Sequence, residues 1–159
     1  TLSFSSAAFA NGGLIPARFT CDGANVSPPF SISSVPEKAQ SLVLIVNDPD
    51  APKGDWDHWV VFNIPPTVRE IPEGKEPPGR GGNNSWSKTS YGGPCPPSGE
   101  PARNASRSDA GGHRYFFRLY ALSKTLAIPV GSTKAKVLAE AKGFMLAEAH
   151  LMSRYKRNK

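Results

Sequence analysis

The chain has 159 residues, a length that fits a single domain over residues 1–159 with a hydrophobic core of its own. Its 16 prolines and 15 glycines are spread between short apolar runs, which excludes long helices and favours a β domain with many turns. Lysine and arginine exceed aspartate and glutamate by 19 to 13. No basic run is longer than residues 154–159, so we interpret it as a solvated tail and expect no nucleic-acid partner.

No apolar stretch approaches the roughly 20 residues that a bilayer-spanning helix needs, and residues 1–4 do not begin a basic-then-apolar signal peptide. The cysteines are Cys21 and Cys95, a pair that does not resemble the disulfide framework of a small secreted domain. We therefore expect a cytoplasmic protein. A single bridge between Cys21 and Cys95 is the less favoured alternative, and a removed signal peptide is left open.

Residues 1–40 alternate turn signals with short apolar pieces and predict short strands and loops. Residues 41–47 hold a continuous apolar run, which predicts a strand buried on both faces. From His58 to Ile64 the pattern alternates, so we expect these two residues to share one face of the next strand and Trp59 to lie on the other.

Residues 67–112 are the least regular part of the chain and are rich in proline and glycine. A long coil in a compact domain usually carries function. Alternation returns at His113 and continues to Leu122, which predicts another strand. His113 and Tyr115 must then point the same way, because side chains two residues apart lie on one face of a strand.

The last part of the chain predicts one short helix and a final strand. Ser132 is a suitable N-cap, residues 134–142 are strong helix formers, and Gly143 suits the C-terminal cap. Alternation then predicts a strand over 145–155, with a continuous helix as the alternative. We predict a mainly β fold of antiparallel sheets with one or two short helices.

Ionisable groups gather at the ends of the predicted strands. Asp48 and Asp50 follow the first strand, His58 begins the second, and His113 and Tyr115 begin the third. A metal site would favour a His-x-His pair, an HExxH helix or paired cysteines, and the sequence has none of these, so we expect no metal and no cofactor. No G-x-S-x-G elbow marks a nucleophile, so we assign no catalytic residue and favour a protein that is not an enzyme.

The remaining hypothesis is recognition of a small anion. A phosphomonoester needs hydrogen-bond donors, which His58, His113 and Tyr115 can supply. Asp48 would either hold an imidazole in its donating tautomer or receive a ligand ammonium group, and Asp50 would shape the turn. The alternative is a hydrolase or phosphotransferase in which Asp48 and His58 form an acid–base pair.

Four motifs, in this order, resemble the phosphatidylethanolamine-binding protein family, and most closely its bacterial and archaeal YbhB/YbcL branch, the Raf kinase inhibitor-like proteins. The motifs are Asp48-Pro49-Asp50-Ala51-Pro52, residues 58–65, residues 91–97 and His113-Arg114-Tyr115. The resemblance spans nearly the whole chain. It implies a β-sandwich of antiparallel sheets with Greek-key connections and a small anion pocket at one end.

The resemblance also implies which residues line the pocket. They are Asp48, Pro52, Trp56, His58, Pro96, Pro97, His113 and Tyr115. A cis bond between Ala51 and Pro52 is implied as well. The ligands implied are phosphate, phosphorylethanolamine-type head groups and similar small phosphorylated or carboxylated anions. Regulation of a kinase or a protease, and a homodimer, are further expectations from the resemblance.

The sequence departs from the family pattern in two places. Residues 99–110 form a polar insertion before the His113 motif and predict a loop near the pocket mouth. Asp57 precedes the pocket histidine, where many animal relatives carry another histidine. A family-typical entrance and the partner behaviour of animal relatives therefore do not follow from the resemblance.

Overall fold

The computed structural model describes residues 1–52, 54–96 and 112–157. Within these residues the chain forms strands, one α-helix and a short 3-10 turn at Ala17–Phe19. The other elements are β1 (Ser3–Ser5), β2 (Phe30–Ser33), β3 (Ser41–Asp48), β4 (Trp56–Ile64), β5 (Glu70–Ile71), β6 (Arg80–Gly81), β7 (His113–Leu122), α1 (Lys134–Ala141) and β8 (Met145–Tyr155).

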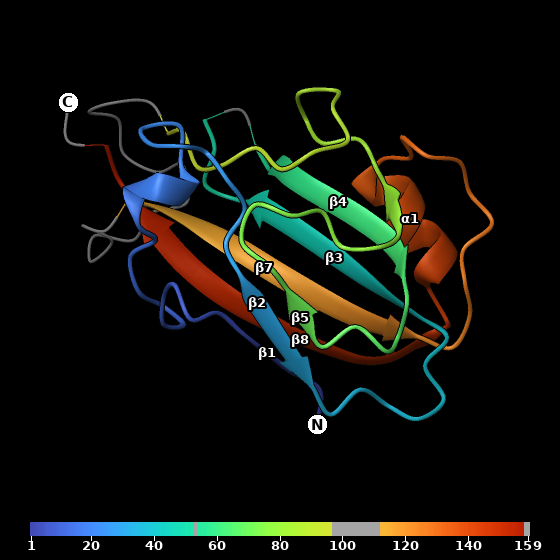
Figure 1. The fold of residues 1–159 in the computed structure, drawn as a ribbon. Coiled ribbons are helices and arrows are strands. Elements are labelled where there is room, and N and C mark those ends of the chain that lie inside the picture. The colour runs from blue at the N-terminus through green and yellow to red at the C-terminus, as the bar shows by residue number, and fades with distance from the viewer. Residues whose placement is uncertain (53, 97–111, 158–159) are drawn as a thin grey trace.

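The strands form two antiparallel sheets, with the smaller sheet in front of the larger one in Figure 1. The smaller sheet has the order β1-β2-β5, and the larger sheet has the order β6-β4-β3-β7-β8. A shared hydrophobic core lies between the sheets, and α1 packs with a second apolar cluster against the other face of the larger sheet, beside β4. The predicted fold class, mainly β with antiparallel sheets and a short helix, is confirmed.

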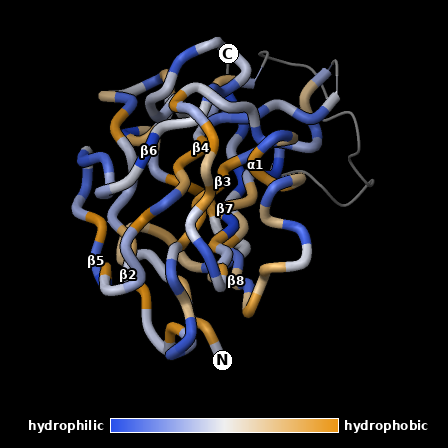
Figure 2. The backbone as a smooth tube through the Cα atoms, turned by 90° about the vertical axis from the view of Figure 1, so that its right-hand side faces the viewer, coloured by the Kyte–Doolittle hydropathy of each residue, from blue (hydrophilic) through white to orange (hydrophobic). Residues whose placement is uncertain are grey.

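Strand β3 lies in the middle of the larger sheet and is buried along its whole length. Leu44 and Val46 belong to the core between the sheets, whereas Val43 and Ile45 belong to the cluster beneath α1. Because both faces are covered, every position favours an apolar residue and no alternation is visible in the sequence. Figure 2 shows the apolar segments of β3, β4 and β7 gathered in the interior.

Strand β8 pairs with β7 along nearly its whole length, which confirms the strand predicted over 145–155 and excludes the continuous helix. Helix α1 is also where the sequence predicts it, but its N-cap is Thr133 and not Ser132. The Thr133 Oγ1 accepts a hydrogen bond from the Lys136 N–H at 3.2 Å, while the Ser132 hydroxyl donates to the Pro129 carbonyl.

Strand β4 does not keep the uninterrupted alternation that the sequence predicts. Its pairing with β3 shifts twice, once between the partners of Leu42 and Leu44 and once between those of Val46 and Asn47. Each shift is a β-bulge, in which one extra residue reverses the face of the residues beyond it. Trp59 and Ile64 therefore both lie in the core between the sheets, whereas Val60 and Phe62 lie beneath α1, so the prediction that Trp59 faces away from Ile64 is wrong.

Two expectations about covalent structure are wrong. Cys21 and Cys95 form a disulfide, with their Cα atoms 5.3 Å apart and the two residues separated by 74 positions in the sequence. The bond between Ala51 and Pro52 is trans. Disulfides persist mainly in oxidising compartments, so the pairing removes the observation that favoured a cytoplasmic location. That location stays a prediction.

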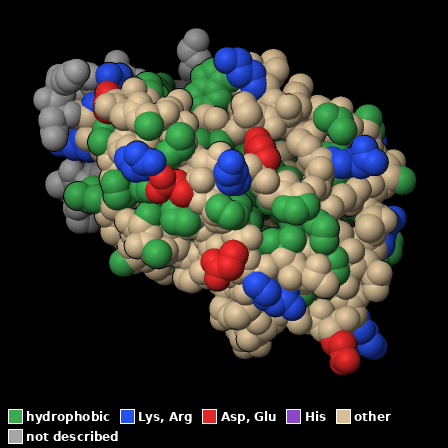
Figure 3. Space-filling view, in the orientation of Figure 1, with side chains coloured by type: hydrophobic (Ala, Val, Ile, Leu, Met, Phe, Trp, Pro, Cys, Tyr) green, Lys and Arg blue, Asp and Glu red, His purple; other side chains and the backbone are tan. Residues whose placement is uncertain are grey.

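The remaining sequence-level expectations concern membranes and surface charge. In the described ranges, no helix combines the length and the apolar character needed to cross a bilayer. Figure 3 shows lysine, arginine, aspartate and glutamate side chains interspersed over one face of the molecule, without a large patch of one sign. The net charge of +6 is therefore not concentrated on that face.

Candidate functional site

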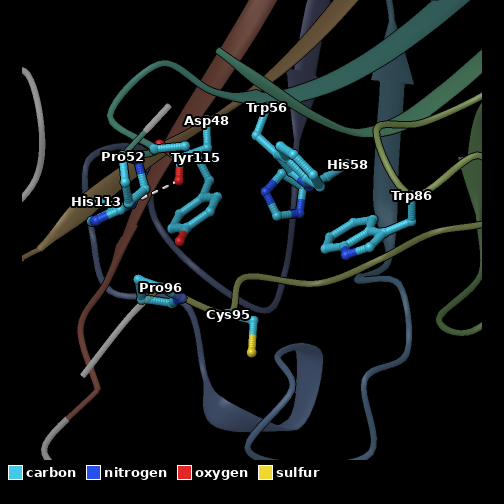
Figure 4. Close-up of a pocket in the computed structure, with 10 residues that line it drawn as sticks. Asp48, Pro52, Trp56, His58, Trp86, Cys95, Pro96, His113 and Tyr115 are labelled. Atoms are coloured by element: carbon cyan, nitrogen blue, oxygen red, sulfur yellow. Dashed lines mark hydrogen bonds and ion pairs between the residues drawn. The ribbon is translucent and has the colours of Figure 1, made fainter. Parts of the chain in front are cut away.

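A cavity of about 430 Å³ opens at the end of the larger sheet where β3 ends and where β4 and β7 begin. The residues that line it are Asp48, Ala51, Pro52, Trp56, His58, Trp86, Cys95, Pro96, His113 and Tyr115. The structure thus brings together every predicted pocket residue except Pro97, which lies outside the described residues. Figure 4 shows Asp48, His113 and Tyr115 on one side of the cavity and His58 and Trp86 on the other.

The bulge in β4 brings His58 into this cavity. Trp59 pairs with Val46 and Asp57 pairs with Asn47, so His58 is the extra residue between two paired positions. In an unbroken strand His58 would point toward α1. Its ring instead lies 5.3 Å from the ring of Tyr115, centroid to centroid, on the face that the smaller sheet covers. Bulges are frequent beside functional sites because they re-aim a side chain in this way.

Asp48 orients His113. The His113 Nδ1–H donates to Asp48 Oδ2 at 2.8 Å, and both side chains are buried. The other carboxylate oxygen, Oδ1, accepts the backbone N–H of Asp50 at 2.7 Å. Because Nδ1 is the donor to the carboxylate, Nε2 is left for a further partner, as a lone pair in the neutral ring and as an N–H in the protonated ring.

His113 Nε2 and the Tyr115 hydroxyl are both buried and have no hydrogen-bond partner among the described residues. The two rings are nearly parallel, with centroids 6.4 Å apart, which confirms that these side chains point the same way. Burial, together with the nearby charge of Asp48, raises the pKa of Tyr115, so its hydroxyl keeps its proton and can donate. Both atoms are positioned to bind something else.

His58 has a different environment. Its Nδ1–H donates to the Gly92 carbonyl at 2.7 Å. Burial lowers the pKa of His58, although this carbonyl favours the protonated ring. The ring is therefore neutral at pH 7, and its Nε2 carries a lone pair. The Asp48 carboxylate is hydrogen-bonded to His113 and to the Asp50 backbone, and the acid–base pair of Asp48 with His58 stays a prediction.

Asp50 does more than shape the turn. It is fully buried, and its carboxylate accepts three hydrogen bonds from Arg114: the backbone N–H at 2.9 Å, Nε at 2.8 Å and Nη2 at 2.9 Å. Burial alone would raise the pKa of Asp50, but the bonds from Arg114 outweigh it and lower the pKa. This bidentate pair ties the segment after β3 to the start of β7, beside His113.

Sequence reasoning missed Trp86, which forms part of the cavity wall. Its ring meets those of Trp56 and His58 edge to face, at centroid distances of 5.5 Å and 5.0 Å. Asn84 holds this loop, because its Oδ1 accepts the backbone N–H groups of Trp86 and Lys88. The one signal in the sequence is an asparagine-rich turn before a tryptophan, which predicts a loop but not where it folds.

A family profile for phosphatidylethanolamine-binding proteins matches residues 5–156. The chain belongs to the phosphatidylethanolamine-binding protein family. One relative, a "UPF0098 protein" of Methanothermobacter thermautotrophicus, is 46% identical over 156 residues, covering 94% of this chain and 95% of the relative. Another, of Aquifex aeolicus, is 43% identical over 159 residues, covering 96% and 87%.

Solved structures of phosphatidylethanolamine-binding protein homologues have the same fold. A homologue from Chlamydia trachomatis has a TM-score of 0.87 at 38% identity, and the match covers 99% of both chains. E. coli YbcL, described as a new member of the mammalian family, has a TM-score of 0.85 at 29% identity and the same coverage. The resemblance to the YbhB/YbcL branch is confirmed. The 99–110 insertion lies outside the described residues, so its place near the pocket mouth stays a prediction.

Proposed function

We propose that this phosphatidylethanolamine-binding protein family member binds small anions, such as phosphate and phosphorylethanolamine-type head groups, in the cavity at the end of the larger sheet. The observation that carries the proposal is the pair of buried atoms, His113 Nε2 and the Tyr115 hydroxyl, that have no hydrogen-bond partner in the part of the chain that the structure describes. Leaving such groups unpaired costs about 1–3 kcal/mol each in a folded protein. A bound anion would accept a hydrogen bond from the hydroxyl and from the protonated imidazole.

The hydrogen bond between Asp48 and His113 agrees with a role in anion binding. The contact of Asp48 with Nδ1 directs the other nitrogen of His113 toward the cavity, as carboxylates do behind many functional histidines. No lysine or arginine is among the residues that line the cavity in the described part of the chain. An anion there would be held mainly by directional hydrogen bonds, which select for ligand shape as well as charge.

A catalytic role is the second candidate, because a carboxylate bonded to an imidazole is also an acid–base arrangement. Here the pair is Asp48 with His113. The cavity wall, as far as the structure describes it, includes no serine, threonine or lysine, and Cys95 is held in the disulfide. A hydrolase or phosphotransferase would therefore need water or a second substrate as nucleophile. Regulation of a kinase or protease, and a homodimer, stay predictions at this stage.

The test is a titration of the protein with inorganic phosphate and with phosphorylethanolamine, followed by NMR. We expect shifts in the side-chain resonances of His58, His113 and Tyr115, and an affinity about tenfold weaker in Tyr115→Phe, because a hydrogen bond to a charged group contributes about 1.5–3 kcal/mol. Tyr120→Phe is the matched control, since Tyr120 is buried beneath α1 near the other end of β7.

Wild-type protein with no shifts at these residues, or equal affinities in Tyr115→Phe and Tyr120→Phe, would contradict the proposal. Incubation with a panel of phosphate and carboxylate esters separates binding from catalysis. Turnover that disappears in His113→Gln would favour the catalytic candidate over a binding protein.

A further inference from the structure

Each carboxylate that the structure describes around the cavity accepts a hydrogen bond from another protein group or forms an ion pair with one. Asp48 accepts hydrogen bonds on both oxygens, and Asp50 is bound by Arg114. Asp55 and Asp57, at the start of β4, both contact the ammonium group of Lys134. A primary ammonium group has three N–H donors, and beside carboxylates that are already bonded the lone pair of His58 Nε2 can accept only one of them.

The wall opposite the donors is aromatic. Trp86 is 40% exposed and stands at a right angle to Trp56, with 77° between the ring planes. Backbone packing fixes the indole, because a Cβ on Gly92 would come within 2.3 Å of the Trp86 ring. The two indoles meet edge to face and both line the cavity, so they form a corner whose π-electrons attract cations.

The ring of His58 separates the two halves of the cavity. Its centroid lies 5.3 Å from that of Tyr115, on the donor side, and 5.0 Å from that of Trp86, on the aromatic side. A ligand with an anionic and a cationic end can thus place the anion at His113 and Tyr115 and the cation at the indoles (Figure 4).

We propose that, among phosphorylated head groups, this cavity prefers those whose cationic end is a quaternary ammonium over those that end in a primary ammonium. The proposal rests on the proposed function, since it assumes that the phosphoryl group binds at His113 and Tyr115. A quaternary ammonium has no N–H to satisfy and is weakly hydrated, so aromatic faces suffice to hold it. Trp86 is then a residue that determines ligand specificity.

The experiment compares dissociation constants, by calorimetry, for phosphorylcholine, phosphorylethanolamine, inorganic phosphate and dimethylbutyl phosphate, the analogue in which carbon replaces the quaternary nitrogen. We expect phosphorylcholine to bind about five- to tenfold more tightly than phosphorylethanolamine or the uncharged analogue, the range that a partly desolvated cation–π contact provides. Vesicles of phosphatidylcholine or of phosphatidylethanolamine test whether the same preference extends to the lipid.

Two substitutions of Trp86 identify the source of the preference. Trp86→Leu keeps an apolar side chain without a π face, and the ratio of the two head-group affinities should fall toward one. Trp86→Phe keeps an aromatic face and should retain most of the ratio. Phe144→Leu is the control, because Phe144 is also 40% exposed but precedes β8 at the opposite end of the larger sheet from His113.

The outcomes separate this inference from the function on which it rests. Phosphate binding with no preference for the choline ligand, in solution and on vesicles, overturns the inference and leaves the proposed function standing. A preference that Trp86→Leu leaves unchanged also overturns it. Failure of phosphate itself to bind at His113 overturns the proposed function and the inference together.

Discussion

Asp48, the last residue of β3, and Asp50, two positions further on, are both buried, yet their surroundings differ. The Asp50 carboxylate accepts three hydrogen bonds from Arg114, whose positive charge also balances its negative charge. Asp48 holds His113 through Nδ1, and within residues 1–52, 54–96 and 112–157 neither His113 Nε2 nor the neighbouring Tyr115 hydroxyl has a hydrogen-bond partner. Paired polar groups stabilise a fold, whereas polar groups kept ready for a ligand do not. The comparison separates a structural carboxylate from a functional one within one motif.

The largest effect on stability is expected at the disulfide, which anchors the pocket wall by a covalent bond. Replacing both Cys21 and Cys95 by serine should lower the free energy of unfolding by about 4 kcal/mol, because the bridge closes a long loop and restricts the unfolded chain. Urea unfolding measures this value. Dithiothreitol should destabilise the wild type to a similar extent and leave the double variant unchanged. If reduction does not lower the free energy of unfolding of the wild type, the disulfide does not stabilise the fold.

The next effect tests the two carboxylates directly. Asp50→Asn should lower the free energy of unfolding by about 3 kcal/mol, because it leaves the Arg114 guanidinium without its buried counter-charge. Asp48→Asn should be less destabilising but should weaken phosphate binding, since the amide orients His113 less firmly. Both quantities come from urea unfolding and phosphate titration. If the two variants lose equal stability and equal affinity, the division between a structural and a functional carboxylate fails.

The third effect is a dependence of stability on pH. Because the folded-state pKa of His58 is lowered, the unfolded chain takes up a proton near pH 6.5 that the folded protein does not. The free energy of unfolding should be constant above about pH 7 and should fall by at most about 1.4 kcal/mol per pH unit below pH 6.5. The lowered pKa of Asp50 adds a further loss below about pH 4.

Urea unfolding between about pH 5 and pH 8 measures this slope. His58→Gln should be nearly flat over that range, because the amide does not titrate and can still donate to the Gly92 carbonyl. An unchanged slope in His58→Gln would assign the proton uptake to another group.

The smallest effect on stability is expected at the group most important for binding. Tyr115→Phe removes a buried hydroxyl that has no partner among the described residues, so the free energy of unfolding should stay within about 0.5 kcal/mol of the wild type or rise. Tyr91→Phe is the control: its hydroxyl donates to the Phe19 carbonyl at 2.7 Å, and its loss should cost about 1 kcal/mol. A large destabilisation by Tyr115→Phe would show that the hydroxyl has a structural partner.

The sequence by itself determined much of the architecture. Local periodicity was enough to predict β3, β7 and β8. A strand buried on one face shows alternating apolar and polar residues, and a strand buried on both faces shows a continuous apolar run. The shared face of His113 and Tyr115 follows from the same geometry. The family motifs added the other pocket residues, all of which line the cavity wherever the structure describes them.

Only the tertiary structure decided how these residues are paired. Asp48 and His113 are 65 positions apart and Cys21 and Cys95 are 74 apart, so no local pattern records which partner each one meets. The bulge that turns His58 into the cavity arises from the register between β3 and β4, which one strand alone does not specify. Periodicity is a property of one segment, whereas a binding site depends on contacts between segments that the fold brings together.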